Sequence, residues 1–231
     1  MLEILYRDEN FVVINKPHGV FVHRTALSSE RVTCLSLLRD QLGVWVYPVH
    51  RLDRATSGVL IFALNSDAAG RLGQLYQNKN ITKEYLAIVR GYTDDSGVID
   101  HPLARDDTKE PMPAHSSYTT LARVELPYAV SVKHPTARYS LVRVETSTGR
   151  LHQVRKHLVH VFHPIIGDTV YGDGRHNKFF RSHFAVNRLC LHASRVRFEH
   201  PYTGQKIILE APLPDDLQGL LKKTGLISDQ V

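Results

Sequence analysis

This sequence of 231 residues contains little cysteine and no long hydrophobic run. Cys34 and Cys190 are its only cysteines, and no C-x-x-C pair is present, so neither a disulfide framework nor a thiolate zinc site is encoded. The apolar runs are only a few residues long, whereas a membrane span requires about 18 or more. The segment from Met1 to Asp8 becomes acidic and polar too soon for a secretory signal. We therefore expect a cytosolic protein without redox chemistry.

The sequence also lacks features that divide a chain or bind common nucleotides. It contains no Gly/Ser-rich linker, internal repeat or low-complexity block. Neither a dinucleotide-binding glycine fingerprint nor a phosphate-binding loop is present. The length suits one large domain or two small ones that share a cleft, and 42% apolar residues can form a substantial core. We expect one domain over residues 1–231 that acts as a monomer.

Positive charge is in excess. The 29 Lys and Arg residues against 23 Asp and Glu give a net charge of +6 and a pI of about 9.3, and arginines outnumber lysines. Guanidinium groups pair with phosphate oxygens through two hydrogen bonds and stack on bases, so the composition favours an anionic partner such as nucleic acid. Many cytosolic enzymes that bind no nucleic acid are also modestly basic, so charge alone leaves that alternative open.

Hydrophobic patterning indicates more strands than helices. Apolar segments predict strands at residues 2–6, 11–15, 58–64, 83–89, 118–125, 138–145, 189–198 and 206–210. Apolar residues at helical spacing predict helices at 35–42, 66–76 with Ser66 as the cap, 151–162 and 215–223. Residues 100–117, with four acids and three prolines, are typical of a long loop. This irregular mixture favours an α+β fold built on a large mixed, mostly antiparallel sheet.

The most distinctive segment is H-R-L-D-R-A-T-S-G at residues 50–58. It places the Asp53 carboxylate between the guanidinium groups of Arg51 and Arg54, which favour its ionised form. An ionised carboxylate suits a nucleophile or a base better than a proton donor. The alternative is that Asp53 only neutralises the two arginines on a surface turn, since surface ion pairs are common and weak.

Residues 50–58 resemble the catalytic loop of the RluA-type pseudouridine synthases, H-R-L-D-x-x-T-S-G, with every fixed position present. Four further segments resemble the same family: N-K-P-H-G at 15–19, K-E-Y-L-A at 83–87, T-G-R-L-H-Q-V-R-K-H-L at 148–158 and H-P-I-I-G-D at 163–168. Residues 22–24 and 171–177 resemble a branch of the family that acts on tRNA. The five ordered matches extend the resemblance over most of the chain.

The resemblance implies a fold and a reaction. Enzymes of this type have a curved sheet with flanking helices and a basic cleft across it, and they turn uridine in RNA into pseudouridine without a cofactor or a metal. Some relatives carry an accessory RNA-binding domain before the catalytic region, and we expect none here because the first strand begins at Leu2. The tRNA branch implies uridine 65 as the target. The alternatives are ribosomal RNA, another tRNA position, or a non-catalytic RNA-binding protein.

By the same resemblance, Asp53 is the catalytic carboxylate. It would act either by attack on the sugar or the base, or by taking a ribose proton through a glycal route, and the sequence leaves both routes open. A glycoside hydrolase would be expected to show a second carboxylate as acid, and these motifs mark none. Arg51 is implied to hold the extruded nucleotide, and its alternative is a structural ion pair with Asp53 or another acid.

Helical geometry gives separate information on Arg155. At about 100° per residue, the apolar residues of the predicted 151–162 helix, Phe162 included, span an arc from about −80° to +80°, and Arg155 lies inside it near +40°. An interior guanidinium requires a carboxylate or several carbonyl partners. We expect Asp53 to be that partner, as the family pairing also implies. The alternative is that Arg155 reaches solvent or caps backbone carbonyls.

Tyr85 lies in a predicted strand, where alternation places it with Ala87 and Val89 on one face and Glu84 and Leu86 on the other. Periodicity alone favours a core tyrosine. In the family, the matching tyrosine covers the flipped uracil, where its ring stacks on the base and its phenol can assist proton removal from C5. The resemblance therefore implies that Tyr85 binds the substrate.

Four histidines cluster between residues 152 and 163, which raises the alternative of a metal-dependent hydrolase. On a helix, His152 and His157 lie about 140° apart, and only His157 and His160 share an edge. We therefore expect no metal site and assign these rings to phosphate contacts or to hydrogen bonds in the core.

Overall fold

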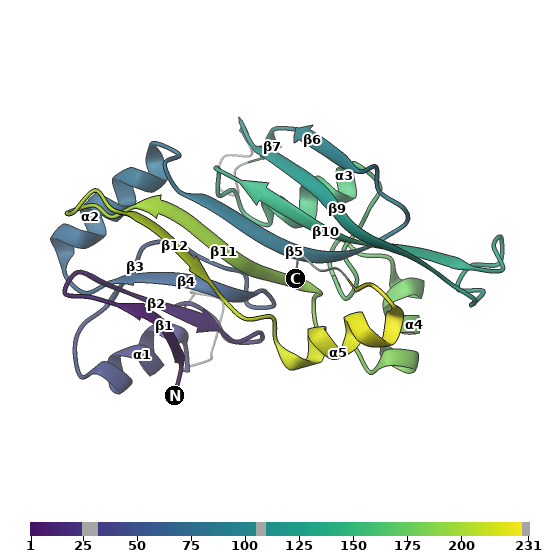
Figure 1. The fold of residues 1–231 in the computed structure, drawn as a ribbon, viewed down its shortest axis with the longest axis horizontal. Helices are drawn as coiled ribbons and strands as arrows, with labels where there is room; N and C mark the ends of the chain where they lie inside the picture. The colour runs from purple at the N-terminus through teal and green to yellow at the C-terminus, as the bar shows by residue number, and fades with distance from the viewer. Residues whose placement is uncertain (25–31, 105–109, 228–231) are drawn as a thin grey trace. The chain divides into compact units, whose positions relative to one another are not determined.

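The computed structural model describes residues 1–24, 32–104 and 110–227 (Figure 1). The chain forms two compact units. The first unit consists of Met1–Lys83 and His192–Pro212, and the second consists of Glu84–Leu191 and Leu213–Val231. Each unit therefore brings together segments that are far apart in the sequence.

The first unit contains a sheet and two described helices. Its strands are β1 (Glu3–Arg7), β2 (Phe11–Lys16), β3 (Tyr47–Pro48), β4 (Ser57–Ala63), β11 (Leu191–Glu199) and β12 (Lys206–Glu210). They follow the order β1-β2-β4-β11, with β3 paired to β4 and β12 to β11. The pairs are antiparallel except that β4 and β11 run parallel. The helices are α1 (Cys34–Leu42) and α2 (Ser66–Gln77).

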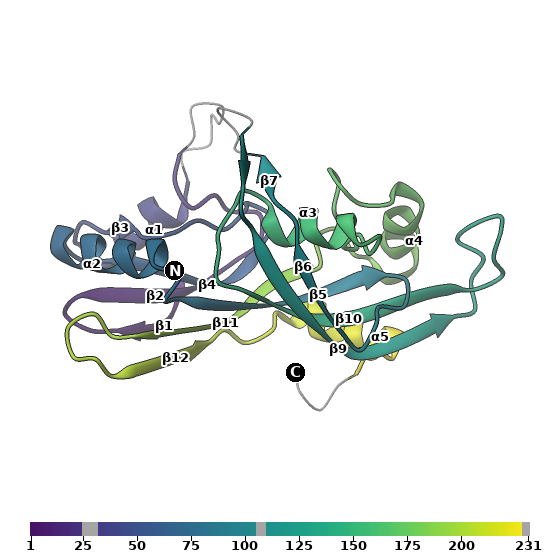
Figure 2. The same ribbon diagram turned by 90° about the horizontal axis from the view of Figure 1, so that it is seen from above.

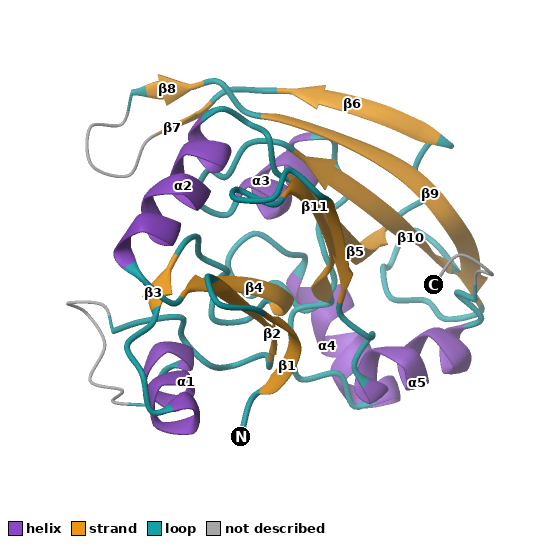
Figure 3. Cartoon of the chain, turned by 60° about the vertical axis from the view of Figure 1, so that its left-hand side comes forward, coloured by secondary structure: helices purple, strands orange, loops and turns teal. Residues whose placement is uncertain are grey.

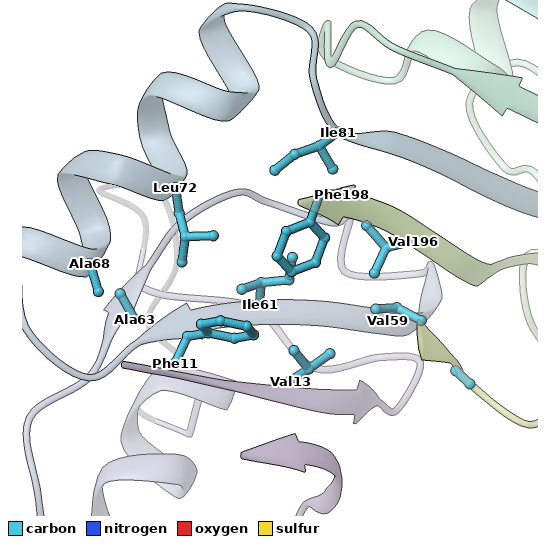
Figure 4. Close-up of a cluster of buried hydrophobic side chains, with 11 residues drawn as sticks. Phe11, Val13, Val59, Ile61, Ala63, Ala68, Leu72, Ile81, Val196 and Phe198 are labelled. Atoms are coloured by element: carbon cyan, nitrogen blue, oxygen red, sulfur yellow. The ribbon is translucent and has the colours of Figure 1, made fainter. Parts of the chain in front are cut away.

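A hydrophobic core lies between the strands of the first unit and α2 (Figure 4). Its members include Phe11, Val13, Val59, Ile61, Leu72 and Phe198. The other face of β2 is buried as well, since Val12 and Ile14 are fully buried. Each such apolar side chain contributes roughly 1.5–3 kcal/mol when it leaves water. Burial on both faces therefore holds β2 and β4 firmly, and β4 directly follows the loop that contains Asp53.

Side-chain and backbone caps define the ends of the two helices. Thr33 is the N-cap of α1, and Gly43 ends that helix with a φ of 69°. The side chain of Asn65 accepts a backbone N–H in the first turn of α2. The prediction of Ser66 as the cap is therefore wrong by one residue, because Asn65 already provides the acceptor and Ser66 is the first helical residue.

The second unit is built on strands that follow the order β5-β10-β9-β6. These are most of β5 (Thr82–Arg90), β6 (Ser96–Asp100), β9 (His115–Leu126) and β10 (Ala137–Thr146), while β7 (Leu103–Ala104) and β8 (Pro111–Met112) form a separate pair (Figure 3). Its described helices are α3 (Gln153–His160), α4 (Gly174–Phe184) and α5 (Asp215–Thr224). Helices α3 and α4 run along one side of the strands (Figure 2).

The α+β class and the mostly antiparallel pairing are confirmed. The prediction of a loop over residues 100–117 is wrong in part, because β7, β8 and the start of β9 lie within it and Leu103 is buried. Helix α4 had no predicted counterpart. No helix in the described ranges is long and apolar enough to cross a membrane. The basic cleft and the single catalytic domain over residues 1–231 stay predictions.

Candidate active site

Asp53 lies in the loop between β3 and β4 of the first unit. The Thr56 N–H donates to the Asp53 carbonyl oxygen at 3.1 Å, which closes a tight turn just before β4 begins at Ser57. The Leu52 side chain is buried, whereas Asp53 is half-buried and Arg51 is exposed. The turn and the buried leucine therefore fix the backbone of Asp53 while part of the residue stays at the surface.

The side chain of Lys16 is fully buried against this loop. Its Nζ donates to the carbonyl oxygens of Pro17, Arg54 and Thr56 at 2.9, 3.1 and 2.8 Å. An ammonium group has three N–H donors, so these three acceptors match its full capacity. The sequence alone does not predict this role of Lys16. The signal that could have found it is the alternation of β2, which places Lys16 on the same face as the buried Ile14.

Arg54 ties the same loop to the turn that follows β2. The Gly19 N–H donates to the Arg54 carbonyl oxygen at 2.8 Å, and Arg54 Nε donates to the Gly19 carbonyl oxygen at 2.9 Å. The guanidinium also lies over the ring of Phe21, 5.1 Å from its centroid. Gly19 has a φ of 81°, a left-handed conformation that favours glycine. Arg54 therefore has a structural role that its position beside Asp53 did not reveal.

Ser57 and Gly58, which end the motif, fit against β11. Ser57 Oγ lies 2.9 Å from His192 Nδ1, and His192 Nε2 lies 3.2 Å from the Ala211 carbonyl oxygen. Because a carbonyl oxygen only accepts, a neutral His192 donates from Nε2 and accepts the hydrogen bond of the Ser57 hydroxyl at Nδ1. Gly58 has a φ of 113°, and a Cβ at this position would overlap the carbonyl oxygen of Ala193. Packing of β4 against β11 therefore requires glycine at position 58, and the Ser57 hydroxyl adds a hydrogen bond between the two strands.

In the second unit, Arg155 of α3 forms a buried ion pair with Asp168 through two hydrogen bonds. Arg155 Nε and Nη2 donate to the carboxylate at 2.7 and 2.8 Å, and the two side chains are only 7% and 1% exposed. The N–H groups of Val170 and Tyr171 donate to the same carboxylate. Burial acts to raise the pKa of Asp168, but the hydrogen bonds from Arg155 and the two backbone groups outweigh it and hold the pKa below its usual value. The carboxylate is therefore ionised at neutral pH.

The interior position that helical geometry predicted for Arg155 is confirmed, as is its need for a carboxylate. The partner that the structure shows is Asp168, which sequence analysis did not identify as one. Pairing between Arg155 and Asp53 concerns residues of the two units and stays a prediction. The prediction that Phe162 belongs to the apolar face is wrong, because α3 ends at His160 and Phe162 has a φ of 65° and is 80% exposed.

Tyr85 is buried in β5 with 8% of its surface exposed. Leu86 and Ile88 line a small apolar cavity together with Leu217 and other residues of α5. Ala87 also lines this cavity, and strand alternation places the Tyr85 side chain on the face opposite Leu86 and Ile88, as the sequence predicted. The role of the Tyr85 ring in substrate binding stays a prediction.

The clustered histidines take part in hydrogen bonds of the second unit. His157 is fully buried, with Nδ1 2.9 Å from Ser116 Oγ and Nε2 3.0 Å from the His101 carbonyl oxygen. Burial lowers the pKa of His157. His163 Nδ1 lies 2.9 Å from the Arg90 carbonyl oxygen. Structural hydrogen bonding, one of the two roles expected for these rings, is thus confirmed for His157 and His163.

Known proteins with similar sequences and folds belong to one family. Residues 10–160 match the family described as RNA pseudouridylate synthase. The tRNA pseudouridine synthase C of Vibrio cholerae is 47% identical over 236 residues, which cover 97% of this chain and 96% of that protein. The Pasteurella multocida protein of the same name is 50% identical over 220 residues and 90% of each chain. The solved structure of human RNA pseudouridylate synthase domain containing 4 has a TM-score of 0.75 at 25% identity, covering 96% of this chain and 93% of that one.

Replacing Asp168 by Asn should destabilise the protein by about 3–5 kcal/mol at pH 7, because it leaves the buried Arg155 guanidinium without its carboxylate. The double variant Arg155→Leu/Asp168→Asn should recover much of this loss, because the unpaired buried charge is then removed while the amide oxygen can still accept the N–H groups of Val170 and Tyr171. The free energy of unfolding in urea measures both effects.

The ion pair also predicts how stability depends on pH. Because the pKa of Asp168 is lower in the folded protein than its unfolded value of 3.8, the stability that Asp168 contributes is present above that value and is lost as the pH falls through the folded pKa. The effect of Asp168→Asn should accordingly shrink in acid, and a variant as stable as the wild type at pH 7 would contradict this account of the pair.

Proposed function

This chain belongs to the RNA pseudouridylate synthase family, and we propose that it converts one specific uridine of tRNA to pseudouridine. The observation that carries the proposal is the similarity, over nearly the whole length of both chains, to proteins named tRNA pseudouridine synthase C. The excess of positive charge is in keeping with a polyanionic substrate.

The reaction breaks the bond between ribose C1′ and uracil N1, turns the base and joins C1′ to C5. The proton on C5 leaves and N1 gains a proton, so the product is an isomer of the substrate. We assign Asp53 as the catalytic carboxylate, either as a nucleophile toward the sugar or base or as the base that takes a ribose proton. The hydrogen bonds from Lys16 and Thr56 support this assignment, because they hold the backbone around Asp53 in one conformation. A catalytic group fixed in advance loses little entropy when it reacts.

Three further residues are assigned to the target nucleotide and to Asp53. A uridine within a tRNA stem must leave the base stack before C1′ and C5 can be reached, at a cost of a few kcal/mol. The exposed Arg51 is suited to bind a phosphate of the extruded nucleotide. The Tyr85 ring is proposed to stack on the uracil of that nucleotide. Arg155 is proposed to pair with Asp53, and the buried Asp168 carboxylate orients its guanidinium.

The proposal also extends to the target and its setting. We propose uridine 65 of tRNA as the nucleotide, the cytosol as the location and a monomer as the acting form. Mapping pseudouridines in tRNA and ribosomal RNA from cells with and without this gene tests the target directly. The expected result is the loss of one pseudouridine at position 65 of tRNA, with ribosomal RNA unchanged. A loss confined to ribosomal RNA would contradict the proposed substrate.

Replacing Asp53 by Asn should lower isomerisation by at least about 10²- to 10⁴-fold, because the amide keeps the shape of the side chain and removes its charge. RNA affinity and the free energy of unfolding should stay close to those of the wild type. Tritium release from tRNA labelled at uracil C5 measures turnover. Asp94→Asn, which alters an exposed carboxylate of the second unit, is the matched control and should be fully active. Turnover by Asp53→Asn at the control rate would remove Asp53 from the catalytic role.

A further inference from the structure

An exposed apolar patch lies between α1 and β3 of the first unit. It consists of Val44, Trp45 and Tyr47, all of which are exposed, and is called the Trp45 patch below. Trp45 is the only tryptophan of the chain and is 67% exposed. Exposure of a large aromatic ring to water is unfavourable compared with its burial. Two exposed aromatic rings and an exposed valine within four residues therefore indicate a surface that is covered when the protein acts.

The Trp45 ring is held in place by Arg39 of α1. The guanidinium carbon lies 3.7 Å from the ring centroid, at stacking distance. Arg39 Nε is buried and has no hydrogen-bond partner in the part of the chain that the structure describes. Arg39 Nε therefore lies against the ring in place of a hydrogen bond. The stacked pair combines a π surface with positive charge.

The register of β3 and β4 separates the Trp45 patch from the Asp53 loop. Tyr47 pairs with Ala63 at the end of β4, whereas the turn that contains Asp53 precedes Ser57 at its start. Six residues of a strand span about 20 Å. The extruded target uridine, if held at Asp53, is thus too far away to cover Trp45. Any nucleotide on the Trp45 patch must be a different one.

We propose that the Trp45 patch stacks on an unpaired nucleobase of the RNA substrate, several nucleotides away from the target uridine. Aromatic rings stack on any base, and Arg39 adds attraction for the neighbouring phosphates. The cation held against the central ring suits a polyanion, and the Trp45 patch lies in the same unit as Asp53, so the RNA substrate is the occupant that these observations favour. The inference rests on the proposed RNA substrate and adds a second contact to it.

The single tryptophan makes this contact directly measurable. Intrinsic fluorescence excited at tryptophan reports on Trp45 alone, and a base stacked on the ring should quench it. Titration with an unmodified tRNA transcript should quench the emission, whereas a blunt RNA duplex of equal length, which offers no unpaired base, should leave it nearly unchanged. Equal quenching by both RNAs, or none by tRNA, would overturn the inference. A change in emission with protein concentration alone would assign the patch to a second copy of this chain and would overturn it as well.

Substitution separates stacking from general charge attraction. Trp45→Ala should weaken tRNA binding by roughly tenfold, within the range found for loss of one base-stacking ring, and should raise KM with little change in kcat. Trp45→Phe should retain most of the affinity because it keeps a π surface. Phe162→Ala, which removes a ring of similar exposure in the second unit, is the matched control and should bind as the wild type does. Wild-type affinity in Trp45→Ala would overturn the inference while leaving the proposed function intact, since failure of the proposed function would show as absent isomerisation in every variant.

Discussion

The candidate active site depends on one buried charge, the ammonium group of Lys16. An unpaired charge of this kind would cost several kcal/mol in the interior of a protein. Here it is matched by three backbone carbonyl oxygens, two of which belong to Arg54 and Thr56 in the loop of Asp53. Burial of the charge and the conformation of the loop are therefore interdependent: the loop cannot open without exposing its carbonyls and leaving Lys16 unsatisfied.

Most residues of the 50–58 motif fix the conformation of the loop that contains Asp53. His50 Nε2 accepts the backbone N–H of Ile61 in β4, and burial, followed by the charge of Lys83, lowers the pKa of His50 to about 3, so the ring is a neutral acceptor. Gly58 permits the close approach of β11. Within residues 50–58 we propose a catalytic role for Asp53 and a substrate contact for Arg51. The structural contacts of the loop come from His50, Arg54, Ser57 and Gly58.

The sequence correctly predicted the position of a side chain where the periodicity of a single helix or strand determines it. The helical angle of Arg155 correctly placed it inside, and strand alternation placed Tyr85 opposite Leu86. Contacts between different elements could not be predicted in this way. Asp168 lies 13 residues from Arg155 in the sequence, and the two side chains meet only when the chain folds back on α3. Helix α4 was missed because its buried face includes His176 and Asn177, which carry no hydrophobic signal. The alternation of β2 could have indicated that Lys16 is buried, but its partners and those of Arg54 are backbone carbonyl oxygens, which a sequence does not display.

The measurement that tests the role of Lys16 most directly is hydrogen exchange of the backbone amides at residues 53–58 in the wild type and in Lys16→Met. Methionine is unbranched, apolar and only one atom shorter than lysine, and it removes the three donors. The carbonyl oxygens of Arg54 and Thr56 then lose their partner, so these amides should exchange at least about tenfold faster, with turnover reduced in parallel and a peptide from α3 in the second unit unchanged. Exchange at residues 53–58 that is as slow in Lys16→Met as in the wild type would contradict the conclusion that Lys16 holds the loop of Asp53.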